Sequence, residues 1–131
     1  MKRIVMAAAA LAALAGAAQA EGDVAKGEQT FKLCQACHAV GPGAKNKVGP
    51  ELNGVVGRKW AAVEGYSYSQ DLTQGRDQGK VWDEATLSQY LENPKLLAPK
   101  GKMAFAGVKK EDDRKNVIAY LAQFDAQGNK K

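Results

Sequence analysis

Both cysteines and the only histidine of this 131-residue chain lie in one five-residue stretch, Cys34-Gln35-Ala36-Cys37-His38. This C-x-x-C-H pattern is the attachment motif for c-type haem. In a helical turn, the two-residue spacing places both sulfurs where they can form thioethers with the two vinyl groups along one porphyrin edge. His38 then brings its imidazole under the iron as the proximal ligand. The attachment motif therefore predicts one covalent haem c per chain, held by Cys34 and Cys37.

Three other kinds of cysteine site are alternatives, and the sequence weighs against each. A thioredoxin-like C-x-x-C pair is expected within a βαβ pattern, which this sequence lacks. A structural zinc ion needs four ligands, commonly Cys and His, whereas the chain has only two cysteines and one histidine. A structural disulfide would leave the adjacent His38 unexplained. Covalent haem is the interpretation that the motif favours.

A low-spin haem iron needs a second axial ligand, and the chain has no second histidine. Of its three methionines, Met1 and Met6 lie at the extreme N-terminus, and Met103 lies in a loop rich in Gly and Lys. Such a loop is a poor place for a methionine that only fills a gap in a core. Met103 is therefore the predicted ligand, with a lysine or a tyrosine as the alternatives. Met/His ligation raises the reduction potential and fills both axial positions, so the iron can only gain and lose one electron.

The first twenty residues have the features of a secretory signal peptide. Lys2-Arg3 precedes an apolar, alanine-rich stretch over residues 4–17, and Ala18-Gln19-Ala20 is a small-x-small cleavage site. The apolar stretch is too short to span a bilayer, although a retained membrane anchor is the alternative. Cleavage after Ala20 would leave residues 21–131 as one soluble domain, which we expect to be a periplasmic monomer. Export agrees with covalent haem, because bacteria attach c-type haem outside the cytoplasm.

The net charge of the chain is +5 and falls slightly when the signal peptide is removed, which argues against nucleic-acid binding. The distribution of charge is more informative, because residues 29–50 and 93–110 contain no acid. These two segments carry His38 and Met103, so their lysines would ring one exposed haem edge and attract an acidic partner. The alternative is two solvated, lysine-rich loops. The lysines predicted to dock are Lys32, Lys45, Lys47, Lys95, Lys100 and Lys102.

Three main helices are predicted to position these residues. The first covers residues 24–33, and the last runs from about residue 111 to 125 with an acidic first turn that suits the helix dipole. The second begins after Asp83, which can cap it, and Asn93-Pro94 ends it. A short helix could also occupy residues 69–72.

The stretch between the first two main helices is rich in glycine, and no part of it alternates long enough to indicate a strand. Aromatic residues make up only 7% of the chain. Long loops without secondary structure usually serve a function or are disordered. We therefore expect an all-α domain in which about three main helices, short helices and long loops wrap around a non-protein group. The polar tail from residue 127 is predicted to fray.

The sequence resembles the class I cytochromes c, and within them the bacterial cytochrome c2 group, over nearly all of residues 22–126. The resemblance implies the cytochrome c fold around one covalent haem. It rests on Gly27, Phe31, Cys34-Gln35-Ala36-Cys37-His38, Val48-Gly49-Pro50-Glu51-Leu52, Gly57-Arg58, Tyr66-Ser67-Tyr68, Trp82, Tyr90-Leu91-Glu92-Asn93-Pro94, Lys102-Met103, Phe105-Ala106-Gly107 and Ala119-Tyr120-Leu121.

The resemblance also implies roles for residues on both sides of the haem. Pro50 would offer its carbonyl to the far ring nitrogen of His38 and so fix the orientation and basicity of that ligand. Tyr90 would donate a hydrogen bond to the sulfur of Met103. Phe105 would cover the haem beside that ligand.

A buried haem propionate would be hydrogen-bonded by Arg58, Tyr68 and Trp82 in a protein of this kind. The residue types agree, because a buried carboxylate is costly unless strong donors pair with it. Ordinary core packing is the alternative role for Tyr68 and Trp82, and both roles can coexist. Gly101 stands where mitochondrial relatives usually have Thr, so a hydroxyl contact to the propionate is lost or replaced, and the counterpart of the family's internal Asn is not assigned.

The function that this resemblance implies is outer-sphere electron transfer, not enzymatic catalysis. The donor would be a quinol-oxidising cytochrome bc complex, and the acceptor a photosynthetic reaction centre or a terminal oxidase. A haem peroxidase or a gas-binding cytochrome is the first rival. It would need an open sixth position and usually a distal acid/base, whereas the single histidine is already used. A thiol–disulfide protein without haem is the second rival.

Overall fold

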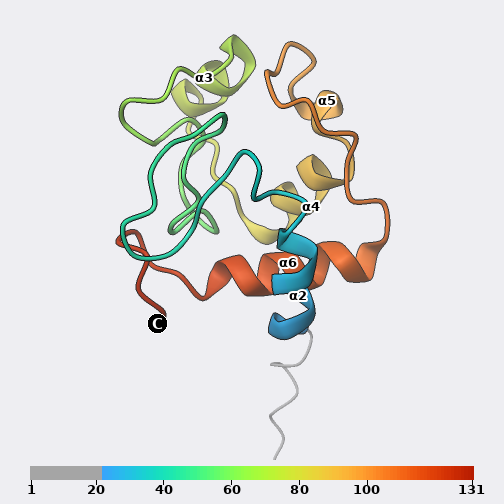
Figure 1. The fold of residues 1–131 in the computed structure, drawn as a ribbon. Coiled ribbons are helices and arrows are strands. Elements are labelled where there is room, and N and C mark those ends of the chain that lie inside the picture. Colours follow the sequence, from blue (N-terminus) through green and yellow to red (C-terminus); the bar gives the residue numbers. More distant parts are fainter. Residues whose placement is uncertain (1–21) are drawn as a thin grey trace, which may run out of the picture.

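The computed structural model describes residues 22–131, so the predicted signal peptide and its cleavage site lie outside the described residues. This part of the chain contains no strand, only two isolated bridges between single residues, in agreement with the all-α prediction. None of its helices is long and apolar enough to cross a membrane. The helices, labelled in Figure 1, are α2 (Val24–Phe31), α3 (Gln70–Asp77), α4 (Glu84–Glu92), α5 (Pro94–Leu97) and α6 (Glu111–Ala122).

Helices α2 and α6 cross closely at the base of the molecule as drawn in Figure 1. Gly27 of α2 lies directly against the backbone carbonyl of Asn116 in α6, with no room for a side chain. The rings of Phe31 and Tyr120 pack beside this point with their centroids 5.5 Å apart. The backbone N–H of Asp23 donates to the Asn116 side chain at 2.7 Å. The first helix of the described chain is therefore held by the last one.

Helix α4 begins and ends where the sequence predicts. The side chain of Asp83 accepts a backbone N–H of the first turn at 2.7 Å. Pro94 ends α4 and occupies the first turn of α5, where its missing N–H costs nothing. The Asn93 side chain caps α5 by accepting the N–H of Lys95 at 3.2 Å. The chain then enters an irregular segment, residues 99–107, which we call the Met103 loop.

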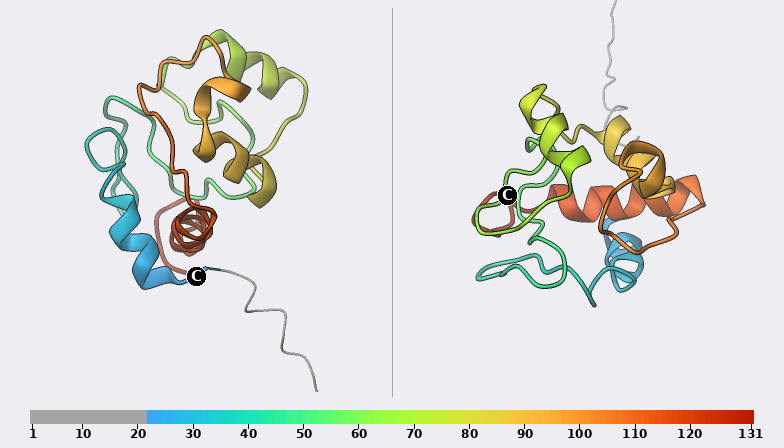
Figure 2. Two further views of the ribbon diagram at one scale, coloured as in Figure 1. Left: turned by 90° about the vertical axis from the view of Figure 1, so that its right-hand side faces the viewer. Right: turned by 90° about the horizontal axis from the view of Figure 1, so that it is seen from above.

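Helix α3 is longer than the short helix predicted over residues 69–72. Asp71 places a negative charge in its first turn, which the helix dipole favours. Gly75 lies inside the helix, directly against the ring of Trp60 with no space for a side chain. That contact compensates for the low helix propensity of glycine. Figure 2 shows α3 on the opposite side of the molecule from the crossing of α2 and α6.

The core is a cluster of buried apolar side chains that includes several aromatic rings. Trp82 stacks on Trp60 with 4.6 Å between ring centroids, and its ring lies 4.9 Å from that of Tyr90. Cys34 and Met103, both partly buried, pack against this cluster, so the attachment motif and the Met103 loop meet the same core. Its members are Phe31, Val55, Trp60, Trp82, Leu87, Tyr90, Leu91, Ala98, Val117, Ile118 and Leu121.

Residues 123–131 form a C-terminal hook instead of the frayed tail that the sequence predicts. The Asp125 side chain accepts two backbone N–H groups within the hook, each at 2.9 Å. Gly128, with a φ of 86°, lies directly against the carbonyl of Gly41. Gly41 in turn exchanges two hydrogen bonds with the buried side chain of Asn53, at 2.7 and 2.9 Å. The hook thus supports the loop that follows the attachment motif.

Candidate haem-binding site

The imidazole of His38 is held in one orientation. The turn of the attachment motif is closed by the His38 N–H, which donates to the Cys34 carbonyl at 2.9 Å. The Nδ1–H of the His38 ring donates to the carbonyl of Pro50 at 2.7 Å. A Cβ at Gly49 would lie 2.5 Å from the His38 Cε1, so only glycine leaves room for the ring here. Nε2 is therefore the ring nitrogen left to bind a metal.

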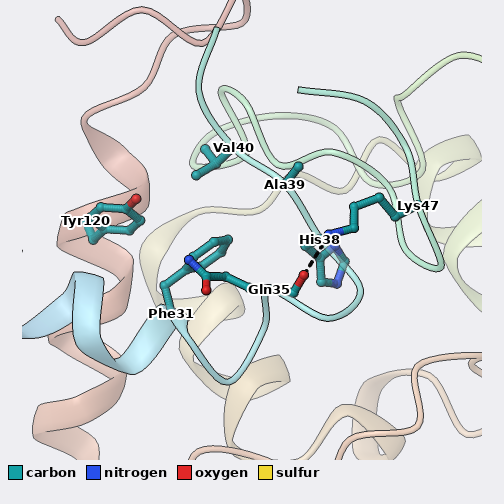
Figure 3. A pocket seen from close by; sticks show the side chains of 7 residues that line it. All are labelled: Phe31, Gln35, His38, Ala39, Val40, Lys47 and Tyr120. Carbon is teal, nitrogen blue, oxygen red and sulfur yellow. Dashed lines mark hydrogen bonds between the residues drawn. The ribbon is translucent and has the colours of Figure 1, made fainter. Parts of the chain in front are cut away.

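The attachment motif is bonded to the segment that contains Pro50. The Gly49 N–H donates to the Cys37 carbonyl at 2.8 Å. The Lys47 ammonium donates to the Gln35 carbonyl at 2.7 Å, the contact drawn dashed in Figure 3. A cavity of about 280 Å³ opens beside His38, lined by Phe31, Gln35, His38, Ala39, Val40, Lys47 and Tyr120.

The pKa shifts in the attachment motif argue against a redox-active thiol pair and favour a metal-binding histidine. Burial, with a smaller effect from Cys37, raises the pKa of Cys34 to about 11, whereas redox-active C-x-x-C pairs have a lowered thiol pKa. Burial is also the main cause that lowers the pKa of His38. The nearby charges of Arg58 and Lys47 act in the same direction, and the hydrogen bond to the carbonyl opposes them. The neutral imidazole, the form that binds metals, is thus favoured.

The sulfur of Met103 is also oriented by a neighbour. The Tyr90 hydroxyl donates to the Met103 Sδ at 3.6 Å. Burial raises the pKa of Tyr90 to about 12, so the hydroxyl keeps the proton that it donates. Phe105 lies two residues further along the Met103 loop and is partly buried, as Met103 is.

Arg58 and Tyr68 are partly buried polar side chains. The Arg58 guanidinium donates to the Asn53 carbonyl at 2.8 Å and lies 3.7 Å from the Glu51 carboxylate. Its Nε is buried and has no partner among the described residues. The Tyr68 hydroxyl accepts the Val63 N–H at 3.0 Å, which leaves its own O–H free to donate.

Sequence reasoning missed two further buried donors, Trp60 and Ser69. The Trp60 Nε1 and the Ser69 Oγ lack a partner within the described chain, like the Nε of Arg58. Arg58 and Trp60 both lie beside Trp82, whose backbone N–H donates to the Arg58 carbonyl at 2.8 Å. Buried polar groups are normally hydrogen-bonded, and a buried carboxylate needs such donors. The residues present therefore fit a haem propionate. A tryptophan within a glycine-rich stretch was the signal available in the sequence.

Comparison with known proteins gives the same assignment. The cytochrome c family matches residues 24–125. The chain is 50% identical to cytochrome c-554 of Methylosinus trichosporium and 46% identical to cytochrome c2 of Blastochloris viridis, with all of both chains covered in each case. The solved structure of cytochrome c2 from Rhodospirillum centenum matches with a TM-score of 0.75 and 39% identity, over 79% of this chain and 99% of that one. The chain belongs to the cytochrome c family.

Its relatives confirm the resemblance to the bacterial cytochrome c2 group, and the structural match confirms the cytochrome c fold. The chain is accordingly an electron-transfer haem protein and not an enzyme, which sets aside the peroxidase and thiol–disulfide rivals. A cytochrome c of this family carries one covalent haem c, and Cys34 and Cys37 fit its attachment.

Proposed function

We propose that this cytochrome c is a soluble periplasmic one-electron carrier, exported by the signal peptide over residues 1–20. Cys34 and Cys37 hold the haem, and His38 and Met103 are its axial ligands. When bound, the haem supplies a one-electron redox couple. The protein's own residues orient the ligands, exclude water and recognise partners.

The two oriented ligand atoms are the observation that carries this proposal. Pro50 accepts the hydrogen of His38 Nδ1 at 2.7 Å, which keeps Nε2 unprotonated and aimed away from that carbonyl. On the other segment, Tyr90 donates to Met103 Sδ at 3.6 Å. Partners of this kind fix ligand orientation and basicity. Because each proposed ligand atom has a hydrogen-bond partner that fixes its side chain, little rearrangement would be needed when the charge of the site changes by one.

Buried donors complete the binding of the cofactor. Arg58, Tyr68 and Trp82 hydrogen-bond a haem propionate, whose burial would be costly without such donors. Phe105 covers the haem beside Met103. The unpartnered Nε of Arg58 supports this role.

The ligation is tested by replacing Met103 with alanine. The oxidised wild-type protein should show the weak red absorption band of sulfur-to-ferric coordination. Met103→Ala should lose that band, and the reduced variant should gain affinity for carbon monoxide because a coordination position opens. Ala104→Ser changes the adjacent, exposed residue and should keep the band. A band that persists in Met103→Ala would exclude Met103 as the ligand.

The proposed partners are a cytochrome bc complex as donor and a photosynthetic reaction centre or terminal oxidase as acceptor. The support is that all six predicted docking lysines are exposed, so an acidic surface can approach them. Within residues 22–131, no ion pair links any of the six to a carboxylate. Unpaired surface cations steer association with acidic partners and lose this effect as salt screens them.

The docking surface is tested with the lysines whose ammonium groups make no hydrogen bond in the described chain, so that only charge changes. Lys32→Gln, Lys45→Gln and Lys100→Gln should each slow electron transfer with an isolated bc complex at low salt. Each should also flatten the fall in rate with rising ionic strength. Lys131→Gln is the control for Lys100→Gln, because the C-terminus lies away from the Met103 loop (Figure 1). A wild-type rate independent of ionic strength would contradict lysine docking and leave the ligation untouched.

A further inference from the structure

Two polar links join the Met103 loop to a region some thirty residues earlier. The backbone N–H of Lys100 donates to the Asp71 carboxylate at 2.5 Å, across 29 residues of sequence. The Lys102 ammonium donates to the Ser67 carbonyl at 2.9 Å and lies 3.4 Å from its hydroxyl. Lys100 and Lys102 are three residues and one residue before Met103. Both links therefore act on the backbone that leads into this ligand.

Other bonds to the Met103 loop lie near its two ends. The Lys95 ammonium donates to the Gly101 carbonyl at 2.7 Å, and the Lys109 ammonium donates to the Ala106 carbonyl at 2.9 Å. The Gly101 N–H donates to the Ala98 carbonyl at 2.8 Å, and the Val108 N–H donates to the Leu91 carbonyl at 2.7 Å. Between these two points, in the part of the chain that the structure describes, no backbone N–H donates to another backbone group. The position of Met103 thus depends on how firmly the start and end of the loop are held.

Extensive helix packing does not join α3 to α5, the helix that precedes this loop, within the part of the chain that the structure describes. The helix pairs that pack extensively within residues 22–131 are α2 with α6, α4 with α6, and α4 with α5. A cavity of about 200 Å³ separates α3 from α5, with Gln74 on one side and Leu96 and Leu97 on the other. Asp71 also lines this cavity. The carboxylate bond to Lys100 is consequently a main connection across the gap, where Figure 1 shows α3 and the Met103 loop facing each other.

We propose that Asp71 is a positioning residue for the axial ligand Met103. Its carboxylate holds the Lys100 N–H, and through it the start of the Met103 loop, in the position from which the sulfur reaches the iron. A charged acceptor makes a stronger hydrogen bond than a neutral one, and a loop ordered in advance loses less entropy when its methionine binds. Gly101 offers no hydroxyl to restrain the loop, so Asp71 supplies that restraint from α3. This inference rests on the proposed ligation by Met103.

The test uses the haem-loaded protein with Asp71→Ala, Asp71→Asn and a matched control, Asp77→Asn. Asp77 belongs to the same helix but is exposed, and its carboxylate pairs with its neighbour Arg76 at 3.4 Å. The first readout is hydrogen exchange of the Lys100 amide, followed by NMR. Losing a hydrogen bond to a charged group should raise that exchange rate about 10- to 100-fold in Asp71→Ala. Asp71→Asn keeps an acceptor oxygen and should lie between this variant and the wild type.

The second readout is the red sulfur-to-ferric band during denaturant titration. In Asp71→Ala the band should disappear at lower denaturant than in the wild type, and before the global unfolding of the helices. Exchange and band unchanged in Asp71→Ala, or changed equally by Asp77→Asn, would overturn the inference. A wild-type protein without the red band would instead refute ligation by Met103, and Lys100 exchange would still decide whether Asp71 restrains the loop.

Discussion

Replacing Gly49 with alanine should disturb the proposed iron ligand directly. The new Cβ would lie 2.5 Å from His38 Cε1 and 2.9 Å from each ring nitrogen, whereas carbon atoms in contact are normally about 3.5–4.0 Å apart. The imidazole must therefore move by roughly 1 Å. Its hydrogen bond to Pro50, now 2.7 Å, would approach about 3.6 Å, where it no longer counts as a bond.

The expected cost follows from these contributions. Overpacking costs about 1–3 kcal/mol, and the lost hydrogen bond adds about 0.5–1.5 kcal/mol. Alanine also restricts the unfolded chain, which returns about 0.4–1 kcal/mol. Gly49→Ala should thus lower the free energy of unfolding by about 0.5–4 kcal/mol, measured by guanidinium denaturation.

The reduction potential gives a second, independent readout of the same variant. Without its hydrogen bond to Pro50, the His38 imidazole is a weaker donor and stabilises the oxidised iron less. The potential should therefore rise by roughly 20–60 mV, which is the free energy of that hydrogen bond converted to a one-electron potential. Val48→Ala, at an exposed neighbouring position, should change neither quantity. A Gly49→Ala protein with wild-type stability and potential would refute this reasoning.

Two further variants test the helices that hold the site. Gly27→Ala places a methyl group against the Asn116 carbonyl, and an overlap with rigid backbone should cost about 3 kcal/mol, the upper end for overpacking. Alanine returns about 1 kcal/mol through its helix propensity, so the free energy of unfolding should fall by about 2 kcal/mol. A stabilised variant would show that α2 and α6 are not in close contact. Asp83→Ala should destabilise the protein at pH 7, because the hydrogen bonds that Asp83 accepts lower its pKa in the folded state. The stability that this carboxylate contributes is present above its unfolded pKa of about 3.9 and is lost as the pH falls through the lower folded value. The difference between wild type and variant in urea titrations should therefore be full at pH 7 and shrink as the pH falls below about 3.9.

The features that the sequence predicts well depend on neighbours along the chain. The attachment motif is five consecutive residues, and the bounds of α4 follow from Asp83 and Pro94, which act within one turn. The start of α6 follows in the same way from an acidic first turn. Local rules of this kind need no knowledge of the fold.

The features that the sequence did not predict depend on distant contacts. The length of α3 reflects the packing of Gly75 on Trp60, and the hook is ordered by Gly128 lying on Gly41. Neither contact leaves a periodic pattern. The buried N–H of Trp60 was missed for a related reason. Its fitting partner is a haem propionate, which is not part of the amino-acid sequence.

The crossing of α2 and α6 has a consequence for the order in which the protein matures. It joins Asp23 to Asn116 across 93 positions, so α2 cannot be held by α6 until almost the whole polypeptide has been made. Contacts between such remote partners form slowly. During that interval the thiols just after α2 stay accessible to a modifying enzyme. Helix α6 packs against α2 only afterwards.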